Sequence, residues 1–297
     1  MDATSPPRIS IVIPAYDEAL SIGRVLDEIA ALGLDAEVIV VNDGSQDETA
    51  QIVRAQRGVR LIEHGYNIGN GAAVKTGIRA ARGSAIVLMD ADGQHRPADI
   101  PQLVSYLDCY DMAVGARLAT SDTAPHRDLA NHLYNAIASY LVGRPIPDLT
   151  SGFRAIRAPV AKRFVYLLPN GFSYPTTITL ALFRAGYTVC YHPIVAPARQ
   201  GRSKIRLLRD GIGFLLTLLR IGTLFVPLRI FLPVAGGLFV LGVGYGIYLL
   251  VFWHRFSNMA VLLILSGIML FMLGLISEQI ALLRMEHADR ALPEDRG

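Results

Sequence analysis

Cysteine and net charge are both scarce in this sequence. Only Cys109 and Cys190 are cysteines among 297 residues, and they do not form a CxxC pair. Neither a disulfide framework nor a cysteine zinc site is therefore expected. The 28 Lys and Arg residues barely outnumber the 25 Asp and Glu residues, and a net charge of +3 is too small to indicate a nucleic-acid-binding protein.

Two common nucleotide-binding motifs are also missing. The loop after the first predicted strand reads PAYDEA instead of GxGxxG, which argues against a nicotinamide-binding Rossmann domain. A phosphate-cradling GxxxxGKS/T motif does not occur anywhere. The first residues, MDATSPPR, lack the basic and apolar regions of a cleaved signal peptide, so the N-terminal domain is expected to stay in the cytosol.

Two long apolar runs lie near the C-terminus. Residues 230–253 and 256–277 contain no Asp, Glu, Lys or Arg. About 20 such residues cross a bilayer core, so transmembrane helices are predicted at about 230–253 and 256–281. Only His254 and Arg255 separate them, which predicts a tight hairpin. Arg and Lys are concentrated on both outer sides of the hairpin, which places the N-terminal domain and the tail (282–297) in the cytoplasm.

The segment 204–229 before the hairpin is amphipathic. Arg206, Asp210 and Arg220 recur at helical spacing, with Leu and Phe on the other surfaces, which predicts helices lying in the membrane interface. A third spanning helix over 211–228 is the alternative, but it would place Arg220 near the bilayer centre at roughly 2.5–3.5 kcal/mol. The interfacial interpretation is favoured, with Pro227 and Pro233 turning the chain into the hairpin.

The first 203 residues are predicted to form one α/β domain. Apolar runs at 9–13, 36–41, 59–63 and 85–89 alternate with helical patterns, as in a mostly parallel sheet covered on both faces. Ligands of such sheets bind at the carboxyl ends of the strands. The loops expected there are polar: PAYDE (14–18), NDGSQDET (42–49), HGYNIGNG (64–71) and DADGQH (90–95).

These loops resemble those of a known family. IVIPAYDEA, VNDGSQDET and MDADGQH, in that order, resemble glycosyltransferase family 2, whose members have the GT-A fold. PDLTSGFRAIR (147–157), QGRSKIRLLRD (200–210) and the hairpin extend the resemblance over the whole chain to the polyprenyl-phosphate glycosyltransferases. The resemblance implies an inner-membrane enzyme that transfers a hexose from a UDP- or GDP-sugar to undecaprenyl or dolichyl phosphate by inverting displacement.

The resemblance assigns a divalent metal, Mg²⁺ or Mn²⁺, to the DADGQH loop. Such ions prefer oxygen ligands and often use only one or two carboxylates, with substrate phosphates and water completing the shell. Asp90, Asp92 and Gln94 are the expected ligands, and Asp92 also counts as catalytic. His95 is expected to serve as a hydrogen-bonding residue.

The resemblance also implies where the nucleotide sugar binds. The expected contacts are Pro14, Tyr16, Asp17, Glu18, Asp43, Asn67, Gly71, Asp90 and Ala91. Some of these residues have a second interpretation. Asp17, like Asp47, is well placed to cap the following helix. Gly69 and Gly71 either admit the nucleotide or only serve the turn.

The lipid phosphate is assigned to a basic set of side chains. The implied contacts are Arg117, Arg127, Ser151, Arg202, Ser203 and Lys204. Arg117 and Asp148 are counted as catalytic, and Asp148 lies with Ser151 and Gly152 on the acceptor side, either as a base or to position the acceptor or an Arg. A phosphate monoester is already anionic at neutral pH, so no obligatory base is needed. Arg202, Ser203 and Lys204 could instead contact lipid headgroups.

Other functions are less consistent with the sequence. Processive polysaccharide synthases carry QxxRW, but the single Trp here, Trp253, lies in an apolar run. A glycolipid synthase with a hydroxyl acceptor would need a base, and a non-catalytic membrane adaptor would leave the intact motifs unexplained. Small residues in the first apolar run, such as Gly237 and Gly244, predict a homo-oligomer. The sugar, the base and the polyprenol length are not encoded in these motifs.

Overall fold

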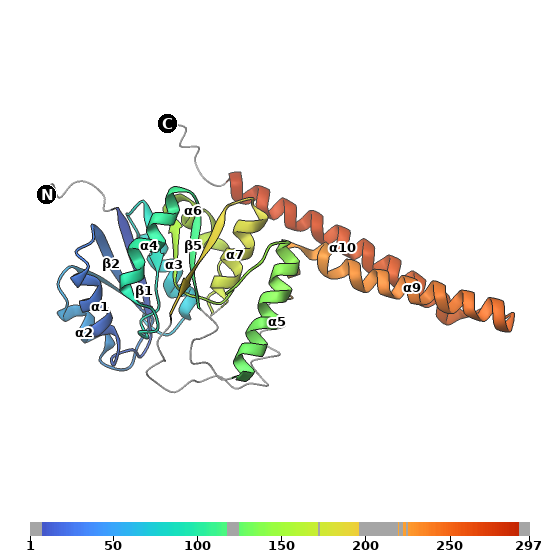
Figure 1. Cartoon of the computed structure of the whole chain (residues 1–297), viewed down its shortest axis with the longest axis horizontal. Coiled ribbons are helices and arrows are strands. Elements are labelled where there is room, and N and C mark those ends of the chain that lie inside the picture. Colours follow the sequence, from blue (N-terminus) through green and yellow to red (C-terminus); the bar gives the residue numbers. More distant parts are fainter. Residues whose placement is uncertain are drawn as a thin grey trace. The chain divides into compact units, whose positions relative to one another are not determined.

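The structure is a computed structural model that describes residues 8–117, 125–171, 173–195, 219, 222–223 and 225–290. Side chains are described in these ranges except at residues 125–133 and 284–290. The chain divides into two units, one of residues 1–136 and 145–211, the other of residues 137–144 and 212–297 (Figure 1). Most of the segment 204–229 lies outside the described residues, so the interfacial helix and the domain boundary at residue 203 stay predictions.

A seven-stranded sheet forms the centre of the first unit. Its strands are β1 (Ile9–Ala15), β2 (Ala36–Asn42), β3 (Val59–Glu63), β4 (Ala85–Leu88), β5 (Met112–Arg117), β6 (Arg154–Arg157) and β7 (Val189–Ile194). They lie in the order β3-β2-β1-β4-β6-β5-β7, and each neighbouring pair is parallel except the two that involve β6. The predicted mostly parallel sheet is confirmed, and the four predicted strands end within two residues of their expected limits.

Helices connect the strands of this unit. They are α1 (Ile22–Ala31), α2 (Thr49–Ala55), α3 (Asn70–Ala80), α4 (Ile100–Ser105), α5 (Pro125–Val142), α6 (Ala158–Phe164) and α7 (Tyr174–Arg184), with 3₁₀ turns at Pro97–Asp99, Tyr106–Asp108 and Val165–Leu167. Helix α5 passes from the first unit into the second after Ala136. Helical spacing had predicted that the first helix begins near Glu18, but α1 begins at Ile22. The residues before it are tied to the second loop, where the amides of Glu18 and Ala19 bond to Thr49 Oγ1 and Asp47 Oδ2.

The core of this unit lies between the sheet and its helices. Alternate residues of β1, Ile11 and Ile13, are completely buried, and α1 buries Ile22, Val25 and Ile29 at helical spacing in the same cluster. Burying each such side chain contributes about 1.5–3 kcal/mol to folding. This core fixes the positions of the strand ends, where the polar loops begin.

The second unit contains two long apolar helices, α9 (Pro227–Trp253) and α10 (Asn258–Arg290). Both are long and apolar enough to cross a membrane. They run side by side, and Gly242 of α9 has no room for a Cβ, which would lie 2.8 Å from the side chain of Ile264 (Figure 1). The predicted hairpin is confirmed. Helix α10 continues to Arg290, through residues predicted to begin a tail, because EQIALLRMEHADR is rich in strong helix formers.

Of the two prolines expected to turn the chain into the hairpin, only Pro227 lies where its first helix begins. Pro227 is the first residue of α9, where its missing N–H is not needed. Pro233 was predicted to turn the chain, but it lies inside α9. It cannot donate to the carbonyl of Arg229, four residues earlier. That carbonyl accepts a hydrogen bond from Tyr140 Oη instead (3.2 Å), so the helix continues past the proline.

Arg229 also binds the C-terminal end of α5 within this unit. Its Nη1 donates to the carbonyls of Tyr140 (2.7 Å) and Leu141 (2.9 Å). The last carbonyls of a helix lack intrahelical partners and carry partial negative charge, so a guanidinium satisfies both their hydrogen bonding and their charge. Glu278 of α10 makes the complementary contact at the N-terminal end of α9, where its carboxylate accepts a hydrogen bond from the amide of Leu228. These polar contacts hold the three helical segments of the second unit together.

Candidate active site

The polar loops of the first unit meet at one edge of its sheet. Strands β1 to β5 are mutually parallel, so the loops that follow them leave from the same edge. Strand β6 is antiparallel and therefore begins at this edge, which brings DLTSGF (148–153) to the same place from the opposite direction. The polar loops and the DLTSGF segment are thus adjacent because β6 runs antiparallel to its neighbours.

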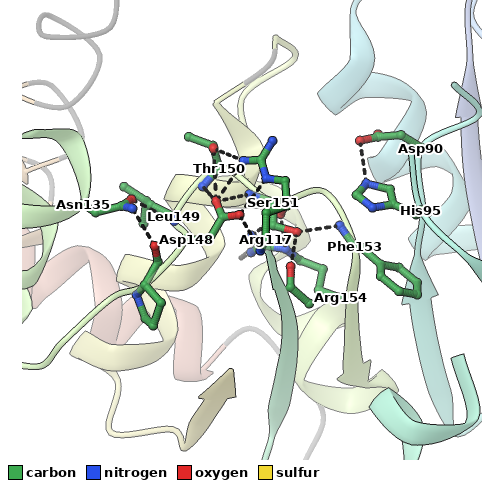
Figure 2. Close-up of polar contacts among 12 residues, drawn as sticks. Asp90, His95, Arg117, Asn135, Asp148, Leu149, Thr150, Ser151, Phe153 and Arg154 are labelled. Carbon is green, nitrogen blue, oxygen red and sulfur yellow. Dashed lines mark hydrogen bonds and ion pairs between the residues drawn. The ribbon is translucent and has the colours of Figure 1, made fainter. Parts of the chain in front are cut away.

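The SGF segment covers the DADGQH loop. Gly152 lies so close to Asp90 that a Cβ on it would be 2.4 Å from Asp90 Oδ2. Phe153 stacks on the buried ring of His95, with 5.1 Å between ring centroids and 21° between planes. His95 Nε2 in turn lies 3.5 Å from Asp90 Oδ2 (Figure 2). Gly152 was expected to line the acceptor side, whereas the structure places it against Asp90.

Asp90 is held in its ionised form. Burial alone would raise the pKa of this carboxyl, but the contact with His95 and the positive charges of Arg117 and Arg154 lower it below its ordinary value. His95 Nδ1 is buried and has no hydrogen-bond partner among the described residues. His95 therefore supports Asp90 through one nitrogen only, in keeping with the hydrogen-bonding role predicted for it.

The loop offers a divalent metal two carboxylates. Asp92 Oδ1 accepts a hydrogen bond from the amide of Gln94 (3.1 Å), which closes a tight turn and keeps Asp92 beside Asp90 in the loop. Within the described ranges, no three His, Cys, Asp or Glu side chains converge as a metal site. Mg²⁺ and Mn²⁺ sites that serve phosphate substrates often have only one or two protein carboxylates. Asp90 and Asp92 fit such a site, which a bound diphosphate would complete.

Arg117 and Asp148 form a bidentate ion pair. Arg117 Nε lies 2.7 Å from Asp148 Oδ2, and Nη2 lies 3.0 Å from Oδ1 (Figure 2). Arg117 Nη2 also donates to Thr150 Oγ1 at 2.7 Å. No described residue accepts a hydrogen bond from Nη1 of Arg117. This fixed guanidinium thus keeps one donor group available for an anion.

The Asp148 carboxylate is saturated with hydrogen bonds. It accepts from Nε, Nη2 and the backbone amide of Arg117, from the amide and hydroxyl of Thr150, and from the amide of Ser151. Burial alone would raise the pKa of Asp148, but the hydrogen bonds and charge of Arg117 lower it below its usual value. A carboxylate so placed is a poor general base, because its lone pairs are already engaged and its proton affinity is low. Its geometry suits the alternative role, the positioning of an Arg.

Arg154 supplies a second, fully buried positive charge. It donates to the carbonyls of Ser151 and Pro175 and to Thr179 Oγ1, and no described carboxylate lies within salt-bridge distance of it. A buried guanidinium without an ion-pair partner is stabilised by nearby negative charge. The charges of Asp90 and Asp148 both act on it, so Arg154 and these two carboxylates stabilise one another.

Asp43 holds the third loop in place. Its Oδ1 bonds to His64 Nδ1 (2.6 Å) and the amide of Ile68 (3.1 Å), and its Oδ2 accepts from the amide of Gly69 (2.7 Å). His64 Nε2 lies 2.9 Å from Thr76 Oγ1, which ties the loop to α3. Asp43 was predicted to contact the nucleotide. The structure shows it almost fully buried beneath the loop.

The first loop is joined to the second by side-chain hydrogen bonds. Asp17 adopts a left-handed backbone with φ 53°, and its Oδ1 accepts from the amide of Gln46 at 2.8 Å. Asp17 therefore bonds to the second loop and not to the helix that follows it. Asp47 caps α2 as predicted, because its Oδ1 accepts from the amide of Thr49, the first residue of that helix, at 3.0 Å, while its Oδ2 accepts from the amide of Ala19. Tyr16 and Asn67 are exposed at this edge, whereas Pro14 and Ala91 are buried.

Close packing explains why residues 69 and 71 are glycines. A Cβ on Gly71 would lie 2.1 Å from the carbonyl oxygen of Pro169, and one on Gly69 would lie 2.4 Å from that of Asn170. The third loop therefore lies against the backbone of 169–171. The structure thus supplies a steric reason for both glycines that involves no nucleotide.

Some predicted contacts fall beyond the described part of the chain. Arg202, Ser203 and Lys204 lie outside it, as does the side chain of Arg127. Ser151 is described and buried, and its Oγ donates to the carbonyl of Gly115 at 2.6 Å. Ser151 is therefore engaged in the loop. Sequence reasoning did not assign roles to His64, Thr150, Arg154 or Asn135; of these, His64, Thr150 and Arg154 lie within quoted loops or motifs that could have drawn attention to them.

Family comparisons agree with this arrangement. The profile described as Glycosyl transferase family 2 matches residues 10–164, and that of the GtrB C-terminal hairpin matches residues 226–283. An undecaprenyl-phosphate 4-deoxy-4-formamido-L-arabinose transferase of Pseudomonas aeruginosa is 28% identical over 96% of this chain and 88% of its own length. A dodecaprenyl-phosphate galacturonate synthase of Rhizobium johnstonii is 31% identical over 54% of this chain and 51% of its own length.

A solved structure shares the fold. Glucosyl-3-phosphoglycerate synthase from Mycobacterium tuberculosis, crystallised with Mn²⁺, UDP-glucose and phosphoglyceric acid, has a TM-score of 0.59 to this chain. The match covers 73% of this chain and 80% of that one, at 22% identity. It confirms the predicted GT-A fold of the first unit.

Replacing Gly152 with Ala should weaken metal binding. The added Cβ would collide with Asp90 Oδ2, so the carboxylate or the loop must move. We expect about 10-fold weaker Mn²⁺ binding in the presence of a nucleoside diphosphate, measured from the electron paramagnetic resonance signal of free Mn²⁺. Gly171→Ala is the control, because a Cβ there meets nothing within 4 Å. Equal Mn²⁺ affinity in the two variants would show that Asp90 does not bind the metal.

Replacing Asp148 with Asn should reduce stability in a pH-dependent way. The pKa of Asp148 is lowered in the folded protein, so its ionised form stabilises the fold above about pH 4, and this stabilisation is lost as the pH falls through the lower folded-state value. We expect Asp148→Asn to lower the free energy of unfolding by about 1.5–3 kcal/mol near neutral pH, and the difference to shrink below about pH 4. Thermal unfolding in detergent between pH 3 and 7 measures this, with the exposed Asp35→Asn as control. A difference that is constant over this range would contradict the assignment.

Proposed function

The chain belongs to glycosyltransferase family 2, and from that premise we propose that it transfers a sugar from a nucleotide-diphosphate sugar to a polyprenyl phosphate. The observation that carries the proposal is the geometry of one sheet edge, where Asp90 and Asp92 lie in the loop beside a guanidinium, Arg117, fixed by Asp148. Two relatives are named as transferases or synthases that act on undecaprenyl and dodecaprenyl phosphate, and these activities, with the matching hairpin, support the choice of acceptor.

The donor site would be built from the first four loops. Asp90 and Asp92, with Gln94, would hold Mg²⁺ or Mn²⁺. A bound divalent cation would neutralise charge on the leaving diphosphate. Exposed groups at the edge, such as Tyr16 and Asn67, are the candidates to contact the nucleoside, with Glu18 beside them. Asp43 would act from beneath, by holding the third loop against which the nucleoside binds.

Arg117 would stabilise negative charge on phosphate oxygens during transfer. Its Nε and Nη2 are occupied by Asp148 and Thr150, so Nη1 is the group directed to the substrate. A donor held in place before the reaction needs no reorganisation as charge develops, which is why fixed hydrogen-bond donors are effective. Asp148 would keep the guanidinium in this orientation and would stay ionised throughout.

The acceptor would attack without help from a base. A phosphate monoester carries negative charge at neutral pH, so its oxygen can displace the nucleoside diphosphate directly and invert the anomeric carbon. A hydroxyl acceptor would need a base to remove its proton. The saturation of Asp148 therefore supports a phosphate acceptor over the hydroxyl of a glycolipid synthase.

The lipid would reach the site from the membrane that the hairpin occupies. We propose the inner membrane, with the first unit in the cytoplasm and the positively charged segments on that side. Arg202, Ser203 and Lys204, together with Arg127, are proposed to bind the lipid phosphate. Homo-oligomerisation through the small residues of α9 stays a proposal; Gly237 and Gly244 have no neighbour within 4 Å of an added Cβ and are open to such contact.

Replacing Asp92 with Ala tests the proposed chemistry. We expect wild-type protein in detergent to transfer sugar to undecaprenyl phosphate with Mg²⁺ or Mn²⁺, and Asp92→Ala to be at least about 100-fold slower, because a direct metal ligand is lost. A screen of radiolabelled UDP- and GDP-sugars measures the transfer and identifies the donor. The exposed Asp108→Ala is the control for loss of a carboxylate.

Two outcomes would contradict the proposal. Equal transfer by wild type and Asp92→Ala would exclude the metal site. Failure of the wild type with every donor would favour a non-catalytic membrane adaptor.

A further inference from the structure

Asn135 of α5 makes an unusual pair of contacts to the loop that carries Asp148. Its Nδ2 donates to the carbonyl of Pro147 at 2.6 Å, and its Oδ1 accepts from the amide of Leu149 at 3.1 Å. Both contacts lie within the first unit. Pro147 and Leu149 are the two neighbours of Asp148, so the carboxamide of Asn135 spans that residue (Figure 2).

The chemistry of this contact requires a carboxamide. The loop presents one acceptor, the carbonyl of Pro147, and one donor, the amide of Leu149, within reach of one side chain. Asn and Gln carry an N–H donor and an oxygen acceptor side by side on one planar group. Residues 145–153 form no helix or strand, so backbone groups there must find partners outside regular secondary structure. Asn135 provides two of these partners and thereby fixes the path of the chain on both sides of Asp148.

The orientation of Arg117 follows from this path. With its two neighbours held, Asp148 directs its carboxylate to receive Nε, Nη2 and the amide of Arg117. The Asp148 side chain is 8% exposed, so it has little freedom to recover this geometry if the loop shifts. Asn135 is therefore linked to the guanidinium through the backbone on both sides of Asp148 and then through the hydrogen bonds between Asp148 and Arg117.

We propose that Asn135 is a positioning residue for sugar transfer, acting through Asp148 to orient Arg117. The inference rests on the proposed function of Arg117 as a phosphate contact. Asn135 itself does not touch the reacting groups. Its removal should leave substrates able to bind but place the guanidinium wrongly in the transition state, where an error of about 1 Å costs about 100-fold in rate.

The first measurement compares Asn135→Ala, Asn135→Asp and wild type in sugar transfer to undecaprenyl phosphate. We expect kcat to fall about 10-fold to 100-fold in Asn135→Ala, with the KM for the nucleotide sugar changed less than about threefold. Asn135→Asp should be at least as impaired, because its second oxygen would face the carbonyl of Pro147 where an N–H donor is needed. Gln102→Ala, which removes an exposed amide from α4, is the control and should match wild type.

The second measurement separates positioning from a merely structural role. If Asn135 acts through Arg117, Asn135→Ala should have little further effect once Arg117 is replaced, so in an Arg117→Lys background it should slow transfer by less than about twofold. Equal losses in the two backgrounds would overturn the inference, and so would an unchanged kcat in Asn135→Ala.

Hydrogen exchange keeps this test distinct from that of the proposed function. The amides of Leu149, Thr150 and Ser151 bond to Asn135 or Asp148, so all three should exchange at least about 10-fold faster in Asn135→Ala while the rest of the first unit is unchanged. A wild type that transfers no sugar would contradict the proposed function, and the positioning of Asp148 by Asn135 would then be judged by exchange alone. Unchanged exchange at these amides would overturn it.

Discussion

Asp148 accepts six hydrogen bonds at the edge of the sheet, and three of them come from Arg117. Removing charge from water is unfavourable, so a pair this buried is stable only when its remaining lone pairs are also satisfied. Here the hydroxyl and amide of Thr150 and the amide of Ser151 complete the set. The pair thereby fixes three things together: the end of β5, the loop before β6 and the direction of one guanidinium.

Charge balance explains why the other groups of the site lie around this pair. The carboxylates of Asp90, Asp92 and Asp148 outnumber the guanidiniums of Arg117 and Arg154 by one, so the site as described is slightly negative. A divalent cation reverses that sign and makes the site suitable for a diphosphate. Gly152 and Phe153 hold the DLTSGF segment against the DADGQH loop, because Gly152 packs on Asp90 and Phe153 packs on His95.

Much of the fold was predictable, because apolar runs and helical spacing are local properties of the sequence. The first four strands, the polar loops at their ends and the apolar hairpin followed from such patterns. Partners distant in sequence did not. Asn135 meets the Asp148 loop, and His64 meets Asp43, only because the antiparallel β6 and the third loop fold back. Pro233 was misplaced for a similar reason, since the hydroxyl that rescues its missing hydrogen bond comes from Tyr140. Asp43 is buried although other residues of its loop are exposed, and the sequence motif does not reveal this difference.

In the proposed mechanism, the acceptor's own negative charge, and not a protein base, makes the attack on the sugar possible. The most direct test compares undecaprenyl phosphate with undecaprenol as acceptors for the same nucleotide sugar, over a range of pH. We expect transfer to the phosphate alone, with a rate that falls below about pH 6 as the phosphate dianion takes up a proton and becomes a monoanion. Transfer to undecaprenol at a comparable rate would contradict it.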